Sequence, residues 1–458
     1  MSTTETVQEH FIEQTTTAED APQVASSAVL LEVHPRRAEL YEELHNRPSP
    51  LVETPCCVSH IAIMVGEDQR QAEYQHLVEL CQRFSIHPPV PGASCFYQNF
   101  GGFELRWESH MEFSTYTFIR TGVDTSQFDG NLFTDSALTY TPRDWLQKLP
   151  GQSLAAVHLT IVCGEEVAAE SLQRSFECMR LSGSQVASGK ADVYTSFRIH
   201  SDGFSRILIN DRNLNPYQAG RLMQRVLEIE TYRLMALLAL PTARKLAPQV
   251  REMEEQLAGI NQRIAALGED ADDNAMLAEL SGLAAQIEQF RSDTNYRFGA
   301  TKAYYDIVNS RLRQLKEVHI PGLQAWQEFI DRRLGPGIKT CDAIKGRMED
   351  LSRRISQTSS LLRTRVELSI ESQNQELLSS MNRRSGLQLR LQQTVEGLSV
   401  AAIAYYLMGL LEYVYDALIE RGITLDKATA LGISVPLVMG ITWWATYKVL
   451  RVVKSEAK

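Results

Sequence analysis

The stretch at residues 428–447, ATALGISVPLVMGITWWATY, decides how this chain of 458 residues is organised. It carries no charge, and a helix of about 20 apolar residues is long enough to span a hydrocarbon core about 30 Å thick. A second uncharged run, GLSVAAIAYYLMGLL, extends over residues 397–411. Two such segments in tandem predict transmembrane helices at 397–418 and 428–450, joined by an outer loop at 419–427.

Residues at the ends of these segments predict their orientation. Trp443, Trp444 and Tyr447 beside Lys448 are typical of an aromatic belt at a membrane interface. Basic residues lie before the first segment and after the second: Arg383, Arg384, Arg390, Lys448, Arg451, Lys454 and Lys458. Because basic flanks stay in the cytoplasm, we expect a multi-pass protein with both termini cytoplasmic and a basic tail at 451–458. The alternative is a buried helical hairpin in a soluble protein.

The composition of the whole chain limits its function classes. The net charge is −10, whereas phosphate binding needs concentrated positive charge, so we expect no nucleic acid as a partner. The seven cysteines show no metal-type spacing, which favours a reduced compartment. Residues 1–30 contain no apolar core long enough for a secretory signal and are predicted to be a disordered tail.

Residues 31–215 have a mixed pattern that predicts an α+β cytoplasmic domain. Helical spacing of apolar residues occurs at 68–84 and 165–181. Strand-like runs occur at 58–65, 94–100, 103–107, 112–119, 154–162, 192–199 and 204–210. Because strands that adjoin by short turns are typical of α+β folds, we do not expect a doubly wound sheet.

Residues 216–396 are predicted to form a helical coiled-coil stalk. Apolar residues at steps of four and three define its seam: Leu246, Val250, Met253, Leu257, Ile260, Ile264 and Leu267. Polar residues 268–273 interrupt the seam, and Leu277, Leu280, Ala284 and Ile287 resume it, which predicts an antiparallel hairpin. A similar pattern follows a turn at 335–337, from Ile344 to Val366, and we expect this helix to run nearly unbroken into the first membrane segment.

One polar segment is a candidate cation site. In residues 103–113, FELRWESHMEF, polar and apolar side chains alternate, as on the two faces of a strand. In one interpretation Glu108, His110 and Glu112 bind a metal ion. In the other, this is a solvated sheet face whose opposite charges pair, because Arg106 lies among the acids and would oppose a metal.

Two acids near the end of the first membrane segment form a second candidate. Glu412 and Asp416 lie four residues apart and therefore share a helix face near the outer loop. Acids at the edge of a membrane span are costly and often functional, so they are candidates for metal or cation binding. Alternatively, they mark the membrane boundary.

Motifs of catalysis are lacking in the sequence. The serines lack a strand–turn–helix elbow, and no cysteine combines a helix start with a histidine partner. We therefore expect no enzymatic activity, no catalytic residues and no cofactor.

Several segments carry a resemblance that covers the chain from about residue 30. They are His34-Pro35, residues 44–48 (LHNRP), 107–113 (WESHMEF), 297–305 (RFGATKAYY), 361–366 (LLRTRV) and 389–406 (LRLQQTVEGLSVAAIAYY). In these segments the chain resembles a bacterial family of uncharacterised membrane-anchored proteins that share a domain of unknown function. The resemblance implies an anchor in the bacterial inner membrane and supplies no activity.

The order of the segments is also similar to that of CorA-type magnesium transporters, which form rings whose first spans line a pore. This chain has Leu407-Met408-Gly409-Leu410 where those proteins carry a Gly-Met-Asn signature. Our leading hypothesis is a homo-oligomer with the architecture of a cation channel or transporter, because two spans in one chain cannot enclose a pore. The alternative is a membrane-tethered scaffold or regulator whose coiled coil contacts a cytoplasmic protein.

Overall fold

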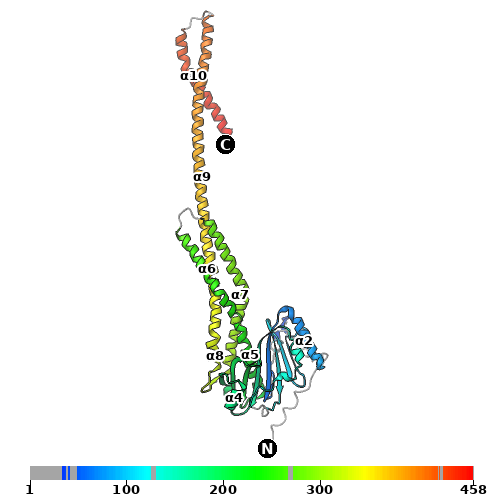
Figure 1. Ribbon diagram of the computed structural model, residues 1–458. Coiled ribbons are helices and arrows are strands. Elements are labelled where there is room, and N and C mark those ends of the chain that lie inside the picture. The colour runs from blue at the N-terminus through cyan, green and yellow to red at the C-terminus, as the bar shows by residue number, and fades with distance from the viewer. Residues whose placement is uncertain are drawn as a thin grey trace. The chain divides into compact units, whose positions relative to one another are not determined.

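The computed structural model describes residues 34–37, 40–41, 49–124, 130–266, 272–420, 422 and 426–456 (Figure 1). The chain forms two compact units: Met1–Arg251 with Gln289–Glu349, and Glu252–Glu288 with Asp350–Lys458. The predicted tail at 1–30 and the motif at 44–48 lie outside the described residues, as do residues 421 and 423–425 of the predicted outer loop.

The first unit is built on a nine-stranded mixed sheet with the order β2-β3-β4-β1-β5-β8-β7-β6-β9. Its strands are β1 (Cys56–Met64), β2 (Cys95–Asn99), β3 (Glu104–Ser109), β4 (Phe113–Thr121), β5 (Gln152–Cys163), β6 (Ser182–Val186), β7 (Ala191–Ile199), β8 (Ser205–Asp211) and β9 (Val318–His319). Neighbours pair antiparallel except β5 and β8, which run parallel. The seven predicted strands are present, and β6 and β9 were not predicted.

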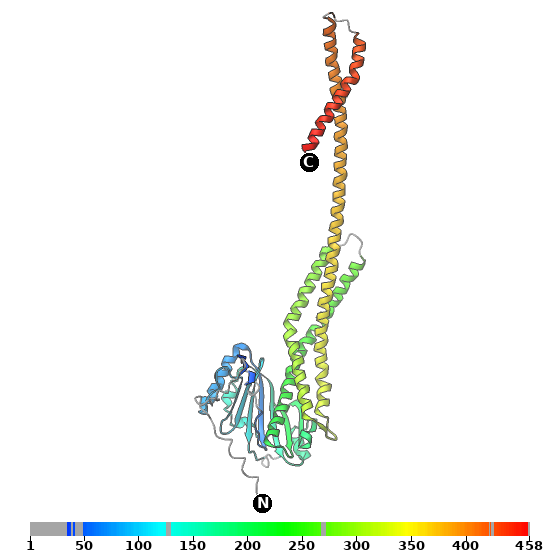
Figure 2. The ribbon, with the colours of Figure 1, turned by 180° about the vertical axis from the view of Figure 1, so that it is seen from behind.

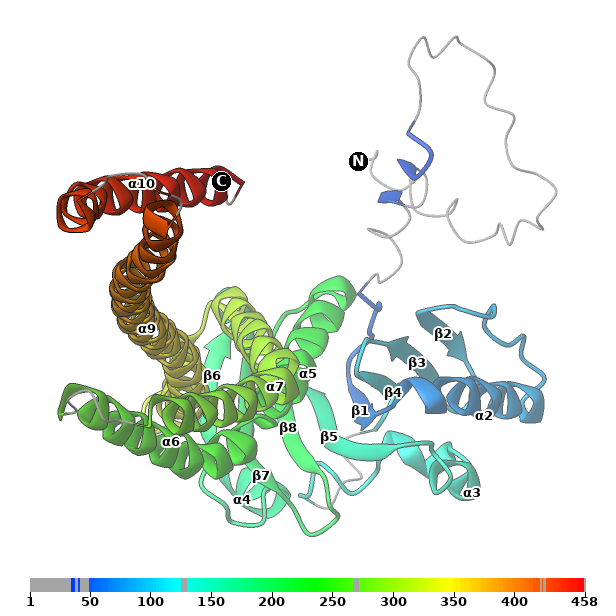
Figure 3. The same ribbon diagram turned by 90° about the horizontal axis from the view of Figure 1, so that it is seen from above.

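Helices cover both faces of this sheet (Figure 3). On one face lie α2 (Arg70–Arg83), α3 (Arg143–Leu146) and α4 (Ala169–Ser175). On the other lies α5 (Pro216–Leu237), whose Leu222, Val226 and Ile229 share a buried core with strands β1, β5 and β8. The helix predicted at 165–181 is shorter than expected, because it begins at Ala169 and ends before Glu177 and Cys178, whose positive φ values are not helical.

Long helices follow the sheet, as predicted. They are α6 (Leu240–Ala266), α7 (Asp273–Leu315), α8 (Trp326–Arg333), α9 (Gly335–Glu420) and α10 (Lys427–Glu456). Of the predicted seam residues, Val250, Leu257, Leu280 and Ile287 are buried. Leu277 and Ala284 of α7 are half-buried, and their neighbours Met276 and Leu283 are buried instead. Supercoiling of these helices stays a prediction.

The last two helices contain the predicted membrane segments. Together with Leu334, which joins them, α8 and α9 form one helical run of 95 residues. The long helix that we expected to continue into the first membrane segment is therefore present. This run and Lys427–Lys448 of α10 are each long and apolar enough to cross a membrane. In the second unit α10 runs back alongside the end of α9 (Figure 2). The Tyr415 hydroxyl of α9 lies 2.6 Å from the Ser434 hydroxyl of α10.

Candidate functional site

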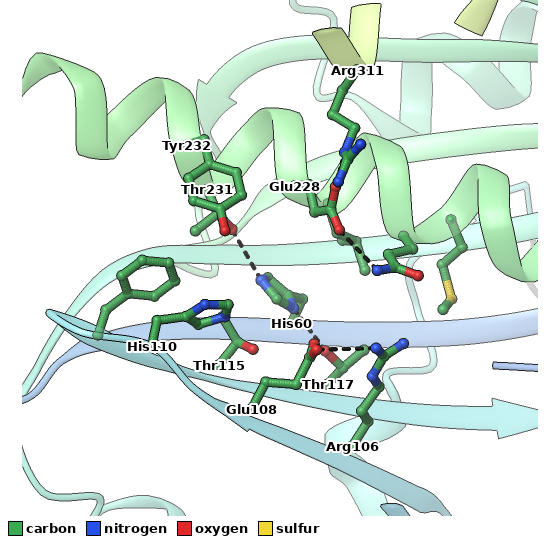
Figure 4. Close-up of a pocket in the computed structure, with 14 residues that line it drawn as sticks. His60, Arg106, Glu108, His110, Thr115, Thr117, Glu228, Thr231, Tyr232 and Arg311 are labelled. Carbon is green, nitrogen blue, oxygen red and sulfur yellow. Dashed lines mark hydrogen bonds and ion pairs between the residues drawn. The ribbon is translucent and has the colours of Figure 1, made fainter. Parts of the chain in front are cut away.

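A cavity of about 270 Å³ lies in the first unit between the sheet and α5 (Figure 4). Strands β1, β3 and β4 form its floor, α5 forms its opposite wall, and α7 contributes one side chain. Its lining residues are His60, Arg106, Glu108, His110, Phe113, Thr115, Thr117, Met223, Gln224, Leu227, Glu228, Thr231, Tyr232 and Arg311. Most of them are polar, which is unusual for the space between a sheet and the helix that covers it.

The β3–β4 hairpin brings the polar segment found in the sequence to this cavity. Its alternation continues only to Ser109, because residues 110–112 form the turn between the strands, where the His110 N–H donates to the Phe113 carbonyl at 2.8 Å. As a result Met111, expected on the apolar face, is 80% exposed. Arg106 is only 4% exposed beneath α5, so this side chain does not lie on a solvated face, whereas Glu104, Glu108, His110 and Glu112 are half-buried.

His60 is held in one orientation at the floor of the cavity. Its Nδ1 lies 2.8 Å from the Thr117 hydroxyl, and its Nε2 lies 3.0 Å from the Thr231 hydroxyl of α5 (Figure 4). Burial lowers the pKa of His60 to about 3, and the nearby His110 and Arg106 act in the same direction. His60 is therefore neutral at physiological pH and joins the sheet to α5.

Two arginine–glutamate pairs face the cavity from opposite walls. On the sheet, Arg106 Nη2 donates to Glu108 Oε1 at 3.0 Å. On the helices, Arg311 of α7 pairs with Glu228 of α5, which also accepts a hydrogen bond from Gln224 Nε2 at 2.8 Å. The predicted pairing of opposite charges is present for Arg106 and Glu108. These four side chains carry no net charge, yet each presents a charged group to the cavity.

Thr115 differs from the other threonines of the cavity. It is 5% exposed, and its hydroxyl has no hydrogen-bond partner among the described residues. Thr117, two residues along the same strand face, uses its hydroxyl to bind His60. Leaving a buried hydroxyl without a partner costs about 1–3 kcal/mol. The free Thr115 hydroxyl is thus a group for which a ligand would supply a partner.

The predicted metal ligands do not come together. Glu108 and His110 line the cavity, whereas Glu112 pairs with Arg297 and Tyr304 of α7 and lines a separate pocket. His110 stacks on Phe113, with ring centroids 4.4 Å apart. Within the ranges that the structure describes, no group of three or more His, Cys, Asp or Glu side chains is placed to hold a metal ion.

In the second unit, the acids at the end of α9 both contact one lysine. Lys427, the first residue of α10, lies 2.6 Å from Asp416 and 3.3 Å from Glu412. The three side chains are each partly exposed. The acids therefore link the two helices of the hairpin through Lys427.

Sequence reasoning missed the residues that complete the cavity: His60, Thr115, Glu228, Thr231 and Arg311. Glu228 and Thr231 lie in α5, whose other buried positions are mostly apolar, with Glu230 as the charged exception. A polar pair at this spacing on a buried helix face was the signal that could have indicated a site. Nothing local in the sequence places Arg311, 83 residues away from Glu228, beside it.

The fold and the cavity define a mixed-sheet domain with a polar pocket, followed by long helices of which two are candidate membrane spans. The chain belongs to the family described as "Protein of unknown function (DUF3422)", whose model matches residues 32–453. Neither the curated proteins nor the solved structures give a match. The likeness to CorA-type transporters therefore has no support from these comparisons.

Proposed function

We propose that this protein is a membrane-anchored regulator whose N-terminal unit binds a small polar ligand in the cavity between β4 and α5. The observation that carries this proposal is a cavity lined mostly by polar and charged side chains, with the unpartnered hydroxyl of Thr115 buried in its wall. A cavity that served only for packing would be lined by apolar side chains, because polar groups without partners cost free energy. A ligand removes that cost by giving the hydroxyl a hydrogen bond.

The charges of the cavity favour a zwitterionic ligand. Arg106 and Arg311 supply two positive groups, and Glu108 and Glu228 supply two negative ones. A ligand with net charge would leave one wall with an unbalanced charge in a partly desolvated space. An ammonium and a carboxylate on one molecule match both kinds of group. The volume of about 270 Å³ limits the ligand to roughly the size of an amino acid, below the range of drug-sized pockets.

Membrane insertion of α9 and α10 supports the anchoring role. Their apolar side chains are largely exposed, including Tyr405, Leu410, Tyr413, Leu437 and Trp444. A contiguous exposed apolar surface of this kind is unfavourable in water and typical of contact with lipid. Following the basic flanks, we place both termini in the cytoplasm and the 419–427 connection outside the bacterial inner membrane.

The helix α9 provides the link that a regulator needs. It begins at Gly335 in the first unit and ends at Glu420 beyond the candidate span. A continuous helix transmits a shift or rotation at one end to the other. We further propose that α6 and α7 form a coiled coil whose exposed surface contacts a cytoplasmic protein, the output of the regulator.

Thermal unfolding of the full-length protein in detergent, with three probes, tests ligand binding. The probes are a mixture of L-amino acids as zwitterions, D-glucose as a polyol and inorganic phosphate as an anion. We expect only the amino acids to raise the unfolding midpoint, and Thr115→Val to reduce that rise. If no probe raises the midpoint, or phosphate alone does, the proposed ligand class is wrong.

Thr115→Val and Thr117→Val form a matched pair, since both threonines lie on the same face of β4 and are buried. Without ligand, Thr115→Val is expected to stabilise the protein by about 1 kcal/mol, because it removes an unpartnered buried hydroxyl. Thr117→Val is expected to destabilise it by about 1–2 kcal/mol, because it removes a partner of His60. Equal effects of the two substitutions would contradict the assignment of Thr115 to a ligand.

The second candidate function is cation transport by a ring of several copies. The continuity of α9 from the first unit into the candidate span favours it, as does the acidic pair Glu412 and Asp416 at its end. Combined Glu412→Gln and Asp416→Asn is then expected to reduce magnesium flux into liposomes. Unchanged flux would remove these acids from transport, and a native mass below that of four copies would exclude a central pore.

A further inference from the structure

In the second unit, no other helix of the described residues accompanies part of α9. The residues of α6 and α7 accompany it as far as Arg365, whose Nη1 donates to the Ile264 carbonyl at 3.4 Å, and whose Nε lies 3.4 Å from Asp273. Beyond this point every described side chain from Glu367 to Val395 is exposed. Both views of the ribbon show this length of α9 running by itself before α10 joins it (Figures 1 and 2).

The composition of this segment is poorly suited to a solitary helix. Residues 367–395 read ELSIESQNQELLSSMNRRSGLQLRLQQTV, with five serines, two asparagines and a glycine. These residue types have weak helix propensity, and propensity alone contributes little to the stability of a helix in water. Helices in proteins gain most of their stability from packing of an apolar face. The segment therefore requires a partner.

An apolar stripe shows which face the partner covers. The buried seam residues Leu351, Ile355 and Leu362 pack inside the second unit. At helical spacing the same face continues with Val366, Ile370, Leu377, Met381, Leu387, Leu391, Val395 and Leu398. From Ile370 onward these side chains are exposed. The stripe thus continues the helix face that packs inside the second unit, but from Ile370 onward no described residues cover this face.

We propose that a second copy of this chain covers the stripe, with the two α9 segments parallel and in register. Anchoring in one membrane gives all copies the same direction and depth, so identical residues of two chains face each other. A second copy of the chain therefore has the direction and depth needed for this pairing without any further interaction. The proposal rests on membrane insertion of α9 and is independent of ligand binding in the cavity.

Polar residues on the same face limit the strength of the contact. Gln373, Arg384 and Gln388 share the stripe by helical spacing. A polar residue in such a seam lowers stability while specifying register. In a parallel pair the two Arg384 side chains face each other and repel. Arg384→Leu should therefore strengthen the pairing, whereas Arg383→Leu, one residue away and off the stripe, should not.

Disulfide crosslinking in membrane vesicles tests the proposal with a matched pair of positions. Leu391 lies on the stripe and Leu389 on the opposite face of the same helix turn, at 67% and 58% exposure. Each is changed to cysteine in the full-length chain, in a background with Cys163→Ser and Cys178→Ser, since those two native cysteines are exposed. We expect Leu391→Cys to form a disulfide-linked dimer at least about tenfold faster than Leu389→Cys, and faster still with Arg384→Leu.

The other results would overturn the proposal. Equal rates at the two positions indicate random collision, and a faster rate at Leu389 places the contact on another face. Failure of both to crosslink, with the background chain as reference, excludes a parallel pair. Carbonate extraction of the same vesicles identifies a failed membrane assignment separately, because a chain that is not anchored is released.

Discussion

Glu73 of α2 is a buried carboxylate whose partners are all uncharged. It is 1% exposed and accepts hydrogen bonds from Trp107 Nε1 and the Tyr116 hydroxyl at 2.9 Å, and from the Ser114 hydroxyl at 3.0 Å. The three donors come from β3 and β4, so this one side chain fixes α2 on the sheet. The arrangement lies on the face opposite the proposed ligand cavity.

Glu73→Gln is expected to lower the free energy of unfolding by about 2–3 kcal/mol, because the amide nitrogen would meet donors where an oxygen now accepts. Urea unfolding followed by tryptophan fluorescence measures the change. Glu79→Gln on the exposed side of the same helix is the control and should have an effect within about 0.5 kcal/mol. A small effect at Glu73 would show that the three hydrogen bonds do not hold α2.

His60 predicts a pH dependence of stability. Its folded-state pKa of about 3 lies below the value near 6.5 of an unfolded chain. The unfolded state therefore binds the proton first, and the stability present above pH 6.5 is lost as the pH falls toward 3. In this window His60 contributes a slope of about 1.4 kcal/mol per pH unit.

Urea unfolding of wild type and His60→Gln between pH 7.5 and 5 measures this slope. Because glutamine does not titrate in this range, the variant is expected to lose stability less steeply than wild type as the pH falls. The difference between the two slopes corresponds to at most one bound proton. Burial also lowers the pKa of His158, to about 4, so this histidine contributes to the pH dependence of stability in both proteins. Identical slopes would mean that His60 is solvated in the folded state.

At the scale of single residues, local patterns identified only part of the cavity. Arg106, Glu108 and His110 were visible because polar residues alternate with large apolar ones. Thr115 and Thr117 were not, because threonine is an ordinary strand residue whose hydroxyl is satisfied in many ways. Whether such a hydroxyl has a partner depends on α5 and α7, which the strand's own sequence does not specify.

At the scale of elements, the hairpin of α9 and α10 is held partly by charge. Lys427→Met would leave Glu412 and Asp416 close together on α9 without a counter-charge. We expect a small fall in the thermal midpoint in detergent, since all three groups are exposed to solvent and their attraction is screened. Adding Glu412→Gln and Asp416→Asn should restore the midpoint. If the triple variant is no more stable than Lys427→Met, charge does not hold the hairpin.

Elements with strong periodicity were predictable, and short ones were not. The strands β1, β4 and β5 carry long apolar or alternating runs, and α9 was expected as a long helix. The strand β9 has two residues and exists only because it pairs with β6.

At the scale of the whole molecule, the class of sheet was predictable but its strand order was not. Short turns between strands indicated antiparallel neighbours, and these make up most of the sheet. The parallel pair β5 and β8 joins segments that begin 53 residues apart, Gln152 and Ser205, and depends on tertiary packing. No local signal selects such a pairing among the alternatives.

The central claim is that α9 and α10 anchor this protein in a membrane. Its most direct test is carbonate extraction of membranes that contain either the full-length chain or a chain that ends at residue 396. We predict that the full-length protein stays in the membrane pellet, while the shortened chain is released to the supernatant with the tryptophan fluorescence of a folded sheet domain. Release of the full-length chain, or retention of the shortened one, would contradict the claim.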